Sequence, residues 1–211
     1  MTLDLIDRLV QKKWLRTPII IDAFRKIKRK DFLRDNLKDL YDANEALPIG
    51  YGQTISQSLV VAFMLEKLQP KQREKILDIG SGSGYTTALL AQIVGNKGKI
   101  ISIELIPELK RFGEKNLLKY NFVKKGIVKF ICADGSKGYK KEAPFDKILV
   151  SASVKKEIPK EWKDQLKIGG KIVSSVRESI WVLEKQTNNQ FKKNEYPGFI
   201  FVPLVQKQNI K

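Results

Sequence analysis

The chain has 211 residues, the length of one domain that can bury a sizeable core. It contains no histidine and one cysteine, which excludes the common zinc sites, histidine-based catalysis and an internal disulfide. Forty lysines and arginines against 23 acids give a net charge of +17, which suits a surface for RNA, DNA or an acidic partner. Because the lysines are scattered along the chain, a lysine-rich solvated surface is favoured over such a partner.

The N-terminal segment is predicted to form two helices. Residues 3–13 place apolar side chains at helical spacing, and Thr17-Pro18 is a cap and first-turn pair for a second helix ending near Ile27. The basic run KIKRK, residues 26–30, falls at that helix end, where we expect solvated side chains and not a nucleic-acid patch. The segment lacks an apolar signal core, and no window approaches the ~20 apolar residues of a membrane span, so we expect a cytoplasmic protein.

The stretch DANEALPIGYGQTIS, residues 42–56, has neither helical nor strand periodicity. It contains one proline, two glycines and several small polar groups, and loops held on rigid elements often carry binding groups. Ser56 is also placed to cap a helix predicted over residues 59–68. The residues alone leave a binding role and a capping role for Ser56 equally open.

A glycine-rich turn follows the first predicted strand. Ile76 to Ile79 form that short buried strand, the next residues include Gly80, Gly82 and Gly84, and a helix is predicted to begin at Tyr85. Glycine permits the tight turn and lets a nucleotide-like ligand approach the backbone N–H groups at the helix start. Taken alone, such a turn can also be purely structural, and its G-x-G-x-G spacing differs from the dinucleotide G-x-G-x-x-G.

Three acids fall at the ends of three consecutive predicted strands. Asp78 lies in the first, Glu104 ends the strand over residues 99–103, and Asp134 lies just beyond the strand over residues 128–132. Because the carboxyl ends of parallel strands share one edge, we expect these acids along one crevice. A carboxylate at the position of Glu104 can accept hydrogen bonds from both hydroxyls of a ribose, which favours an adenosine-type ligand.

The remaining elements complete one doubly wound α/β domain with a seven-stranded, mostly parallel sheet. Cys132 ends the apolar run VKFIC and is expected to be a buried strand residue. Residues 1–57 are predicted to be a helical extension with a covering loop, and residues 58–211 the Rossmann-like core. Further predicted elements are helices over residues 107–120 and 160–166, strands over 147–151 and 170–176, and a C-terminal antiparallel hairpin formed by 180–186 and 198–205.

These motifs resemble those of the protein-L-isoaspartate (D-aspartate) O-methyltransferase family. DIGSGSG with a later acid is similar to motif I of S-adenosylmethionine-dependent methyltransferases, and LPIGYGQTIS shortly before ILDIGSGSGY resembles the isoaspartyl family more specifically. The resemblance covers nearly the whole chain, since it extends to KDFL at 30–33, ADG at 133–135, APFD at 143–146, IP at 158–159, the QL and GG of 165–170, and FVPLV at 201–205.

The resemblance implies a class I methyltransferase that uses S-adenosyl-L-methionine to methylate the free α-carboxylate of L-isoaspartyl and D-aspartyl residues in damaged proteins, which initiates their repair. It implies that Ser56 is the catalytic residue that orients the substrate carboxylate, with Gln53, Thr54 and Ile55 lining the substrate pocket. We expect a monomer without a metal or a membrane partner. The implied cofactor-binding residues are Asp78 near the methionine amino group, Asp134 at the adenine amino group, and Gly80, Ser81, Gly82, Gly84, Tyr85, Glu104, Leu105 and Gly135.

The chain departs from the family pattern in two places. After TIS the family commonly has a small or polar residue, a proline and an aromatic residue or histidine, whereas this chain has Gln57 to Leu59. After the fifth strand the family usually has P-V-G and then a glutamine, whereas Ser175, Arg177 and Trp181 stand here. Two alternatives therefore stay open, a related methyltransferase that acts on RNA or another acceptor, and a cofactor-binding module without turnover.

Overall fold

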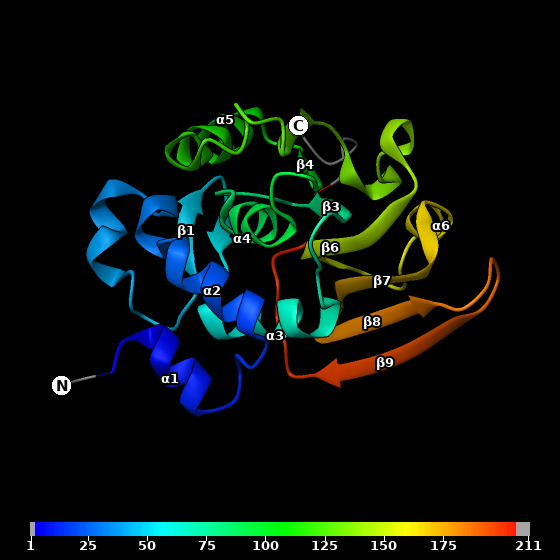
Figure 1. The fold of residues 1–211 in the computed structure, drawn as a ribbon, viewed down its shortest axis with the longest axis horizontal. Coiled ribbons are helices and arrows are strands. Elements are labelled where there is room, and N and C mark those ends of the chain that lie inside the picture. The colour runs from blue at the N-terminus through cyan, green and yellow to red at the C-terminus, as the bar shows by residue number, and fades with distance from the viewer. Residues whose placement is uncertain (1–2, 206–211) are drawn as a thin grey trace.

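The computed structural model describes residues 3–205, and the predicted domain limits at residues 1–2 and 206–211 lie outside this range. Its centre is a seven-stranded sheet in the order β5-β4-β3-β6-β7-β8-β9 (Figure 1). The first five of these strands are parallel, and β8 pairs antiparallel with both β7 and β9, so the predicted sheet is confirmed. The strands are β3 (Lys75–Ile79), β4 (Lys99–Glu104), β5 (Val128–Cys132), β6 (Phe145–Val154), β7 (Leu166–Val176), β8 (Ser179–Lys185) and β9 (Phe191–Pro197).

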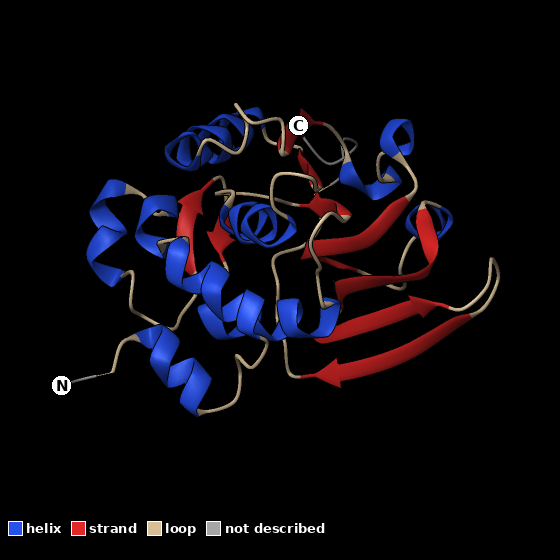
Figure 2. Ribbon diagram, viewed as in Figure 1, coloured by secondary structure: helices blue, strands red, loops and turns tan. Residues whose placement is uncertain are grey.

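Helices cover both faces of the sheet (Figure 2). Successive strand residues point to opposite faces, so Ile76 and Ile100 join one apolar cluster while Leu77 and Ile101 join the other. The second cluster is closed by Trp162, which is fully buried. The first cluster includes residues of α3 (Ser58–Leu68), α4 (Tyr85–Val94) and α5 (Pro107–Leu117), and the second packs against α6 (Lys160–Asp164).

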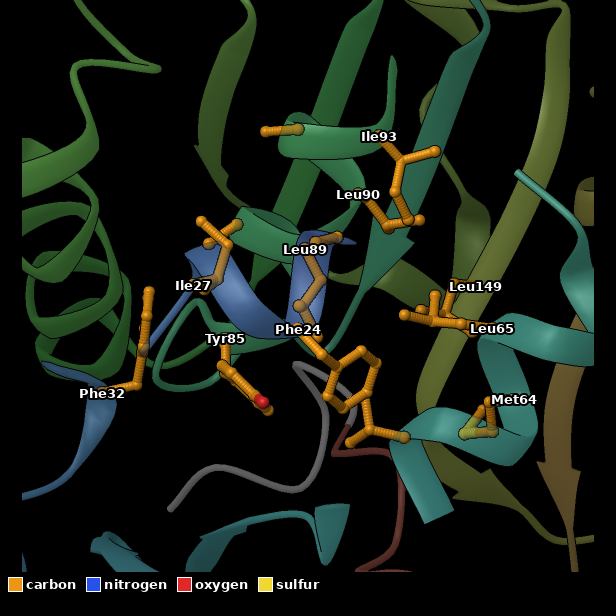
Figure 3. Packing of buried hydrophobic residues seen from close by; sticks show 14 of the residues in the cluster. Phe24, Ile27, Phe32, Met64, Leu65, Tyr85, Leu89, Leu90, Ile93 and Leu149 are labelled. Carbon is orange, nitrogen blue, oxygen red and sulfur yellow. The ribbon is translucent and has the colours of Figure 1, made fainter. Parts of the chain in front are cut away.

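The N-terminal extension shares its core with the sheet domain. Phe24 and Phe32 pack on Tyr85, with ring centroids 6.3 and 5.4 Å away (Figure 3). The buried carboxylate of Glu66 on α3 accepts hydrogen bonds from the Arg16 and Thr17 N–H groups and from the Thr17 hydroxyl. The extension consists of α1 (Leu5–Gln11), α2 (Pro18–Lys26) and the 3-10 turns η1 (Arg29–Phe32) and η2 (Asp35–Leu40).

The stretch expected to be irregular contains a β-hairpin, so that expectation is wrong. β1 (Leu47–Gly50) pairs antiparallel with β2 (Gln53–Ile55) across a turn at Tyr51 and Gly52. Both turn residues have positive φ, 56° and 68°, as the right-handed twist of a two-residue hairpin requires. The strands are too short for their alternation to be recognised in the sequence.

The C-terminal hairpin uses a different second strand from the predicted one. β9 spans Phe191–Pro197, and its polar residues gave no apolar signal because it is the edge strand of the sheet. Residues 198–205 instead return beside the end of β6. There the Ser153 N–H donates to the Val202 carbonyl and the Leu204 N–H donates to the Ser153 carbonyl, both at 2.8 Å.

Two further expectations are corrected, for Cys132 and Arg29, and one open alternative is decided, for Ser56. Cys132 is exposed, because it ends β5 at the other edge of the sheet. Arg29, within the basic run expected to be solvated, is only 6% exposed. Ser56 does not cap α3, because the N-cap position is Gln57 and the side chain of Asn44 accepts the hydrogen bond from the Leu59 N–H.

Candidate active site

A cleft opens at the carboxyl edge of the parallel strands, between the glycine turn and the β1–β2 hairpin. It comprises three adjoining cavities of about 50, 30 and 290 Å³, and Thr54 and Ser151 line all three. We call the three together the carboxyl-edge cleft. The first cavity contacts the ends of β3, β4 and β5, the second lies between the glycine turn and Ser56, and the third lies between Ser56 and Phe201. The cleft thus brings the two main predicted motifs together.

The glycine turn provides bare backbone along one wall. Gly80 and Gly82 line the cleft with φ of 75° and 50°, a conformation that L side chains rarely adopt. A Cβ on Gly82 would approach Ile49 Cδ1 to 3.0 Å, and one on Gly135 would come within 2.4 Å of Ile79 Cγ2. Side chains at these positions would push the hairpin and the strand ends out of place.

Glu104 belongs to the same wall of the cleft as the glycine turn. It is 7% exposed, its Oε2 accepts from the Gly82 N–H at 2.9 Å, and its Oε1 accepts from the Ile106 N–H at 3.0 Å. Burial raises the pKa of Glu104, while these backbone donors oppose that rise. Each carboxylate oxygen can accept a second hydrogen bond, so Glu104 can still receive two hydroxyl donors from a ligand. Leu105 lines the cleft beside it.

Asp78 lies beneath the glycine turn and does not line the cleft. It is fully buried, and its Oδ2 accepts from the hydroxyls of Thr87 at 2.6 Å and Thr86 at 3.2 Å. Its Oδ1 has no hydrogen-bond partner within residues 3–205. Burial raises the pKa of Asp78 to about 6 against the two threonine donors. The ionised form of such a buried carboxylate favours the binding of a cationic group above the turn.

The other predicted cofactor residues differ in their exposure to the cleft. Gly135 and Ala133 line it on either side of Asp134, whose Oδ1 accepts from the Ser136 N–H at 2.9 Å. Ser81 lines the cavity beside Ser56, and its buried Oγ has no hydrogen-bond partner in the described chain. Gly84 instead packs against α5, since a Cβ there would meet Leu117 Cδ1 at 2.6 Å.

Tyr85 has a largely structural position. It begins α4, is 4% exposed, and its ring belongs to the aromatic cluster with Phe24 and Phe32 (Figure 3). It also lines the small cavity next to Ser56. Its ring therefore forms the floor between that cavity and the N-terminal extension.

Two arginines hold the loop that carries Ser56. Arg34 donates from Nε and Nη2 to the Ile49 carbonyl at 2.8 and 2.6 Å, and its guanidinium lies 4.1 Å from the centroid of the Phe112 ring. Arg29 donates to the carbonyls of Ala43 at 3.0 Å and Glu45 at 2.7 Å. These contacts fix the hairpin over the glycine turn, so that Gln53, Thr54, Ile55 and Ser56 face the cleft.

A further wall of the cleft is formed by Ser151 and by the segment after β9, neither of which was among the predicted site residues. Ser151, in β6, lines all three cavities, and its buried Oγ has no hydrogen-bond partner in the part of the chain described here. The returning segment adds Val202, Pro203, Leu204 and Val205 to the wall. Ser151 ends the predicted strand over residues 147–151, so its place at the carboxyl edge could have identified it. The contribution of residues 202–205 depends on chain reversal and has no local signal.

Of the positions that depart from the family pattern, Gln57 lines the third cavity of the carboxyl-edge cleft, whereas Ser175, Arg177 and Trp181 line none of its cavities. Ser175 is fully buried inside β7. Arg177 occupies the β7–β8 turn with φ of 55° and donates from Nε to the Lys155 carbonyl at 3.3 Å. Trp181 is half-buried on β8, with the Lys193 ammonium 3.0 Å from its ring centroid. Ser175, Arg177 and Trp181 therefore do not change the walls of the cleft.

Residues 3–205 offer no metal site and no membrane-spanning helix. No group of three or more histidine, cysteine, aspartate or glutamate residues there could hold a metal ion. No helix in that range is long and apolar enough to cross a membrane.

Comparisons with known proteins agree with this geometry. The family model described as protein-L-isoaspartate(D-aspartate) O-methyltransferase matches residues 2–209. The chain is 37% identical to the protein-L-isoaspartate O-methyltransferase of Methanopyrus kandleri, over 98% of this chain and 92% of that protein. It is 42% identical to protein-L-isoaspartate O-methyltransferase 2 of Archaeoglobus fulgidus, over 88% of this chain and 84% of that protein.

A solved structure supports the fold. A Plasmodium falciparum protein described as a putative protein-L-isoaspartate O-methyltransferase, in complex with S-adenosyl-L-homocysteine, superposes with a TM-score of 0.86 at 22% identity, covering 97% of this chain and 99% of that one. The sequence comparisons identify the family directly, since a family model spans almost the entire chain. The chain belongs to the protein-L-isoaspartate(D-aspartate) O-methyltransferase family.

Proposed function

We propose that this protein transfers the methyl group of S-adenosyl-L-methionine to the free α-carboxylate of isoaspartyl residues in damaged proteins. One observation carries the proposal, namely that three adjoining cavities, all lined by Thr54 and Ser151, extend from Glu104 past the glycine turn to Ser56. Family membership supports the same reaction, because relatives at 37% and 42% identity carry the name of that activity.

The residues of the cleft fit an adenosine-type cofactor with an amino acid group. Gly80, Gly82 and Gly135 leave room at positions where a Cβ would be strained or would collide. Glu104 is held by two backbone donors in the orientation that suits a ribose, and Asp78 beneath the turn suits an ammonium. When bound, the cofactor supplies an electrophilic methyl group on a sulfonium.

The chemistry of the acceptor explains why the chain needs no histidine. An isoaspartyl residue offers a free α-carboxylate with a reference pKa of roughly 3.5, which is ionised at neutral pH without a general base. The protein has to place that oxygen in line with the methyl group and exclude water. The hydroxyl of Ser56 donates a hydrogen bond to the substrate carboxylate. Thr54 and Ser151 lie between the second cavity of the cleft and the third, since they line both.

The third cavity accommodates the peptide. It measures about 290 Å³ and is lined by Ala46, Gln57, Val60 and the segment Ile200 to Val202, in addition to the three hydroxyl residues. Its apolar and uncharged character suits a peptide backbone with varied side chains. The departures at Ser175, Arg177 and Trp181 lie outside it, whereas the departure at Gln57 lies in its wall.

The proposal is tested by methyl transfer from radiolabelled S-adenosylmethionine to an isoaspartyl peptide and to its aspartyl twin, with base-labile ester as the readout. We expect label on the isoaspartyl peptide alone. Absence of label while S-adenosylhomocysteine still binds would contradict the proposal and would make RNA the next acceptor to examine.

A further inference from the structure

The third cavity of the carboxyl-edge cleft, of about 290 Å³, has one side rich in hydroxyl groups and one mostly apolar side. The hydroxyl residues Thr54, Ser56 and Ser151 line both this cavity and the second one, which lies beside the glycine turn. The residues that line the third cavity and neither of the other two are Ala46, Gln57, Val60, Ile200 and Phe201. None of these five is charged and four are apolar, so the part of the cavity away from the glycine turn suits an apolar group.

Ile200 is an apolar residue of this side that the fold itself leaves uncovered. Its neighbours Phe199 and Phe201 both pack against the larger apolar cluster, and the Phe199 ring stacks on Phe63 of α3 with ring centroids 4.8 Å apart. Ile200, between them, is 82% exposed although it lines the third cavity. Its side chain therefore contributes little to the core, and an apolar group that enters the cavity can cover it.

The segment that carries Ile200 is held on both sides of this residue by backbone hydrogen bonds. The N–H of Phe199 donates to the Glu178 carbonyl in the β7–β8 turn at 3.0 Å. The Val202 carbonyl accepts from the Ser153 N–H of β6 at 2.8 Å. Because both partners belong to the sheet or to its turns, Ile200 keeps a fixed place beside the cavity.

We propose that Ile200 and Val60 select isoaspartyl substrates that carry an apolar side chain directly before or after the isoaspartyl residue. This inference rests on the proposed function, in which Ser56 holds the substrate carboxylate. Consecutive Cα atoms are about 3.8 Å apart across a peptide bond, and the isoaspartyl linkage adds a single methylene. An adjacent residue is therefore close enough to the carboxylate to share the cavity that Ser56 and Ile200 both line.

The physical basis of the selection is burial. An apolar side chain in the third cavity leaves water and covers Ile200 at the same time, whereas a polar side chain of similar size loses hydration against a mostly apolar wall. The contact is remote from the reacting atoms, so it is made equally in the ground state and in the transition state. The preference should therefore appear in KM more than in kcat.

The test measures kcat/KM of the full-length protein for two pairs of isoaspartyl peptides. The members of one pair differ only in leucine or glutamine directly before the isoaspartyl residue, and those of the other pair only in the residue directly after it. Both side chains are neutral, so the net charge of +17 acts equally on each pair. In at least one pair we expect leucine to give at least about a fivefold higher kcat/KM, through a lower KM.

Two exposed isoleucines allow a matched comparison of variants. Ile200→Ser should reduce the leucine advantage to less than about twofold, and it should melt as the wild type does because this side chain is 82% exposed. Ile168→Ser makes the same change at an isoleucine of β7 that is 61% exposed and lines none of the three cavities of the cleft. It should keep the full leucine advantage.

Methyl transfer to all four peptides with equal kcat/KM within both pairs would overturn this inference and leave the proposed function intact. An undiminished leucine advantage in Ile200→Ser, or its loss in Ile168→Ser, would overturn the inference as well. Absence of methyl transfer to every peptide, while S-adenosylhomocysteine still binds, would instead overturn the proposed function and the inference with it.

Discussion

At the scale of single residues, the proposed reaction depends on the hydroxyl of Ser56. Ser56 lines the cleft and does not cap α3. We expect Ser56→Ala to lower kcat/KM for an isoaspartyl peptide about 10- to 100-fold, the value of a hydrogen bond to a charged group, and to leave the affinity for S-adenosylhomocysteine unchanged. Kinetics and calorimetry measure both. Ser58→Ala, two residues later and outside the cleft, is the matched control, and an equal loss in both variants would contradict this role.

The buried carboxylate of Asp78 makes a second prediction at this scale. Its pKa in the folded protein, about 6, exceeds the usual 3.8, so its contribution to stability is present below pH 3.8 and is lost as the pH rises through about 6. The difference corresponds to about 3 kcal/mol. We therefore expect Asp78→Asn to raise the free energy of unfolding by up to this amount above pH 6, with no gain near pH 4, and to weaken S-adenosylhomocysteine binding.

Denaturant titrations between pH 4 and 8 measure the effect of Asp78→Asn. The control is Asp146→Asn, because Asp146 accepts from the Lys75 N–H at the opposite end of β3 and from the Lys167 ammonium. This control should lose stability instead of gaining it. A destabilised Asp78→Asn protein at pH 8 would contradict the prediction, because it would mean that the surroundings stabilise the ionised carboxylate.

At the scale of elements, the hairpin and the glycine turn form the cleft only if they remain in close contact. Gly82→Ala would set a Cβ 3.0 Å from Ile49 Cδ1 on β1 at a positive φ. We expect a loss of about 1 kcal/mol in stability and at least a tenfold loss in S-adenosylhomocysteine affinity, measured by thermal melting and calorimetry. Gly126 also has a positive φ, but a Cβ there would have no atom within 4 Å. Gly126→Ala should therefore lose stability and keep its affinity for S-adenosylhomocysteine. An unchanged affinity in Gly82→Ala would mean that the hairpin can move away without consequence.

At the scale of the whole molecule, the net charge of +17 predicts a difference between two substrate classes. RNA binding through about six phosphates would weaken by roughly 10³ between 50 and 200 mM salt. We expect kcat/KM for a neutral isoaspartyl peptide to change less than about threefold over that range, and we expect single-stranded RNA not to compete at 150 mM salt. Steep salt dependence or RNA competition would favour the RNA alternative. Light scattering in the same buffers should report a monomer.

The sequence by itself determined the parallel strands, the glycine turn and the Ser56 loop motif, because each is specified by a short run of neighbouring residues. Ile76, Leu77 and Ile79 are apolar enough to specify a buried strand, and the glycines after them are required by the turn. Glu104 and Gly135 were located in the cleft because the strand ends of a parallel sheet meet at one edge.

Only the tertiary structure decided features that depend on contacts between distant segments. Residues 202–205 reach the cleft because the chain returns beside Ser153 after an edge strand that carries no apolar pattern. Arg29 is buried because the carbonyls of residues 41–56 converge on it, although its neighbours in sequence are exposed lysines. Cys132 is exposed because β5 is the last strand of the sheet. Burial of these side chains is set by which segments pack against them, and local sequence does not contain that information.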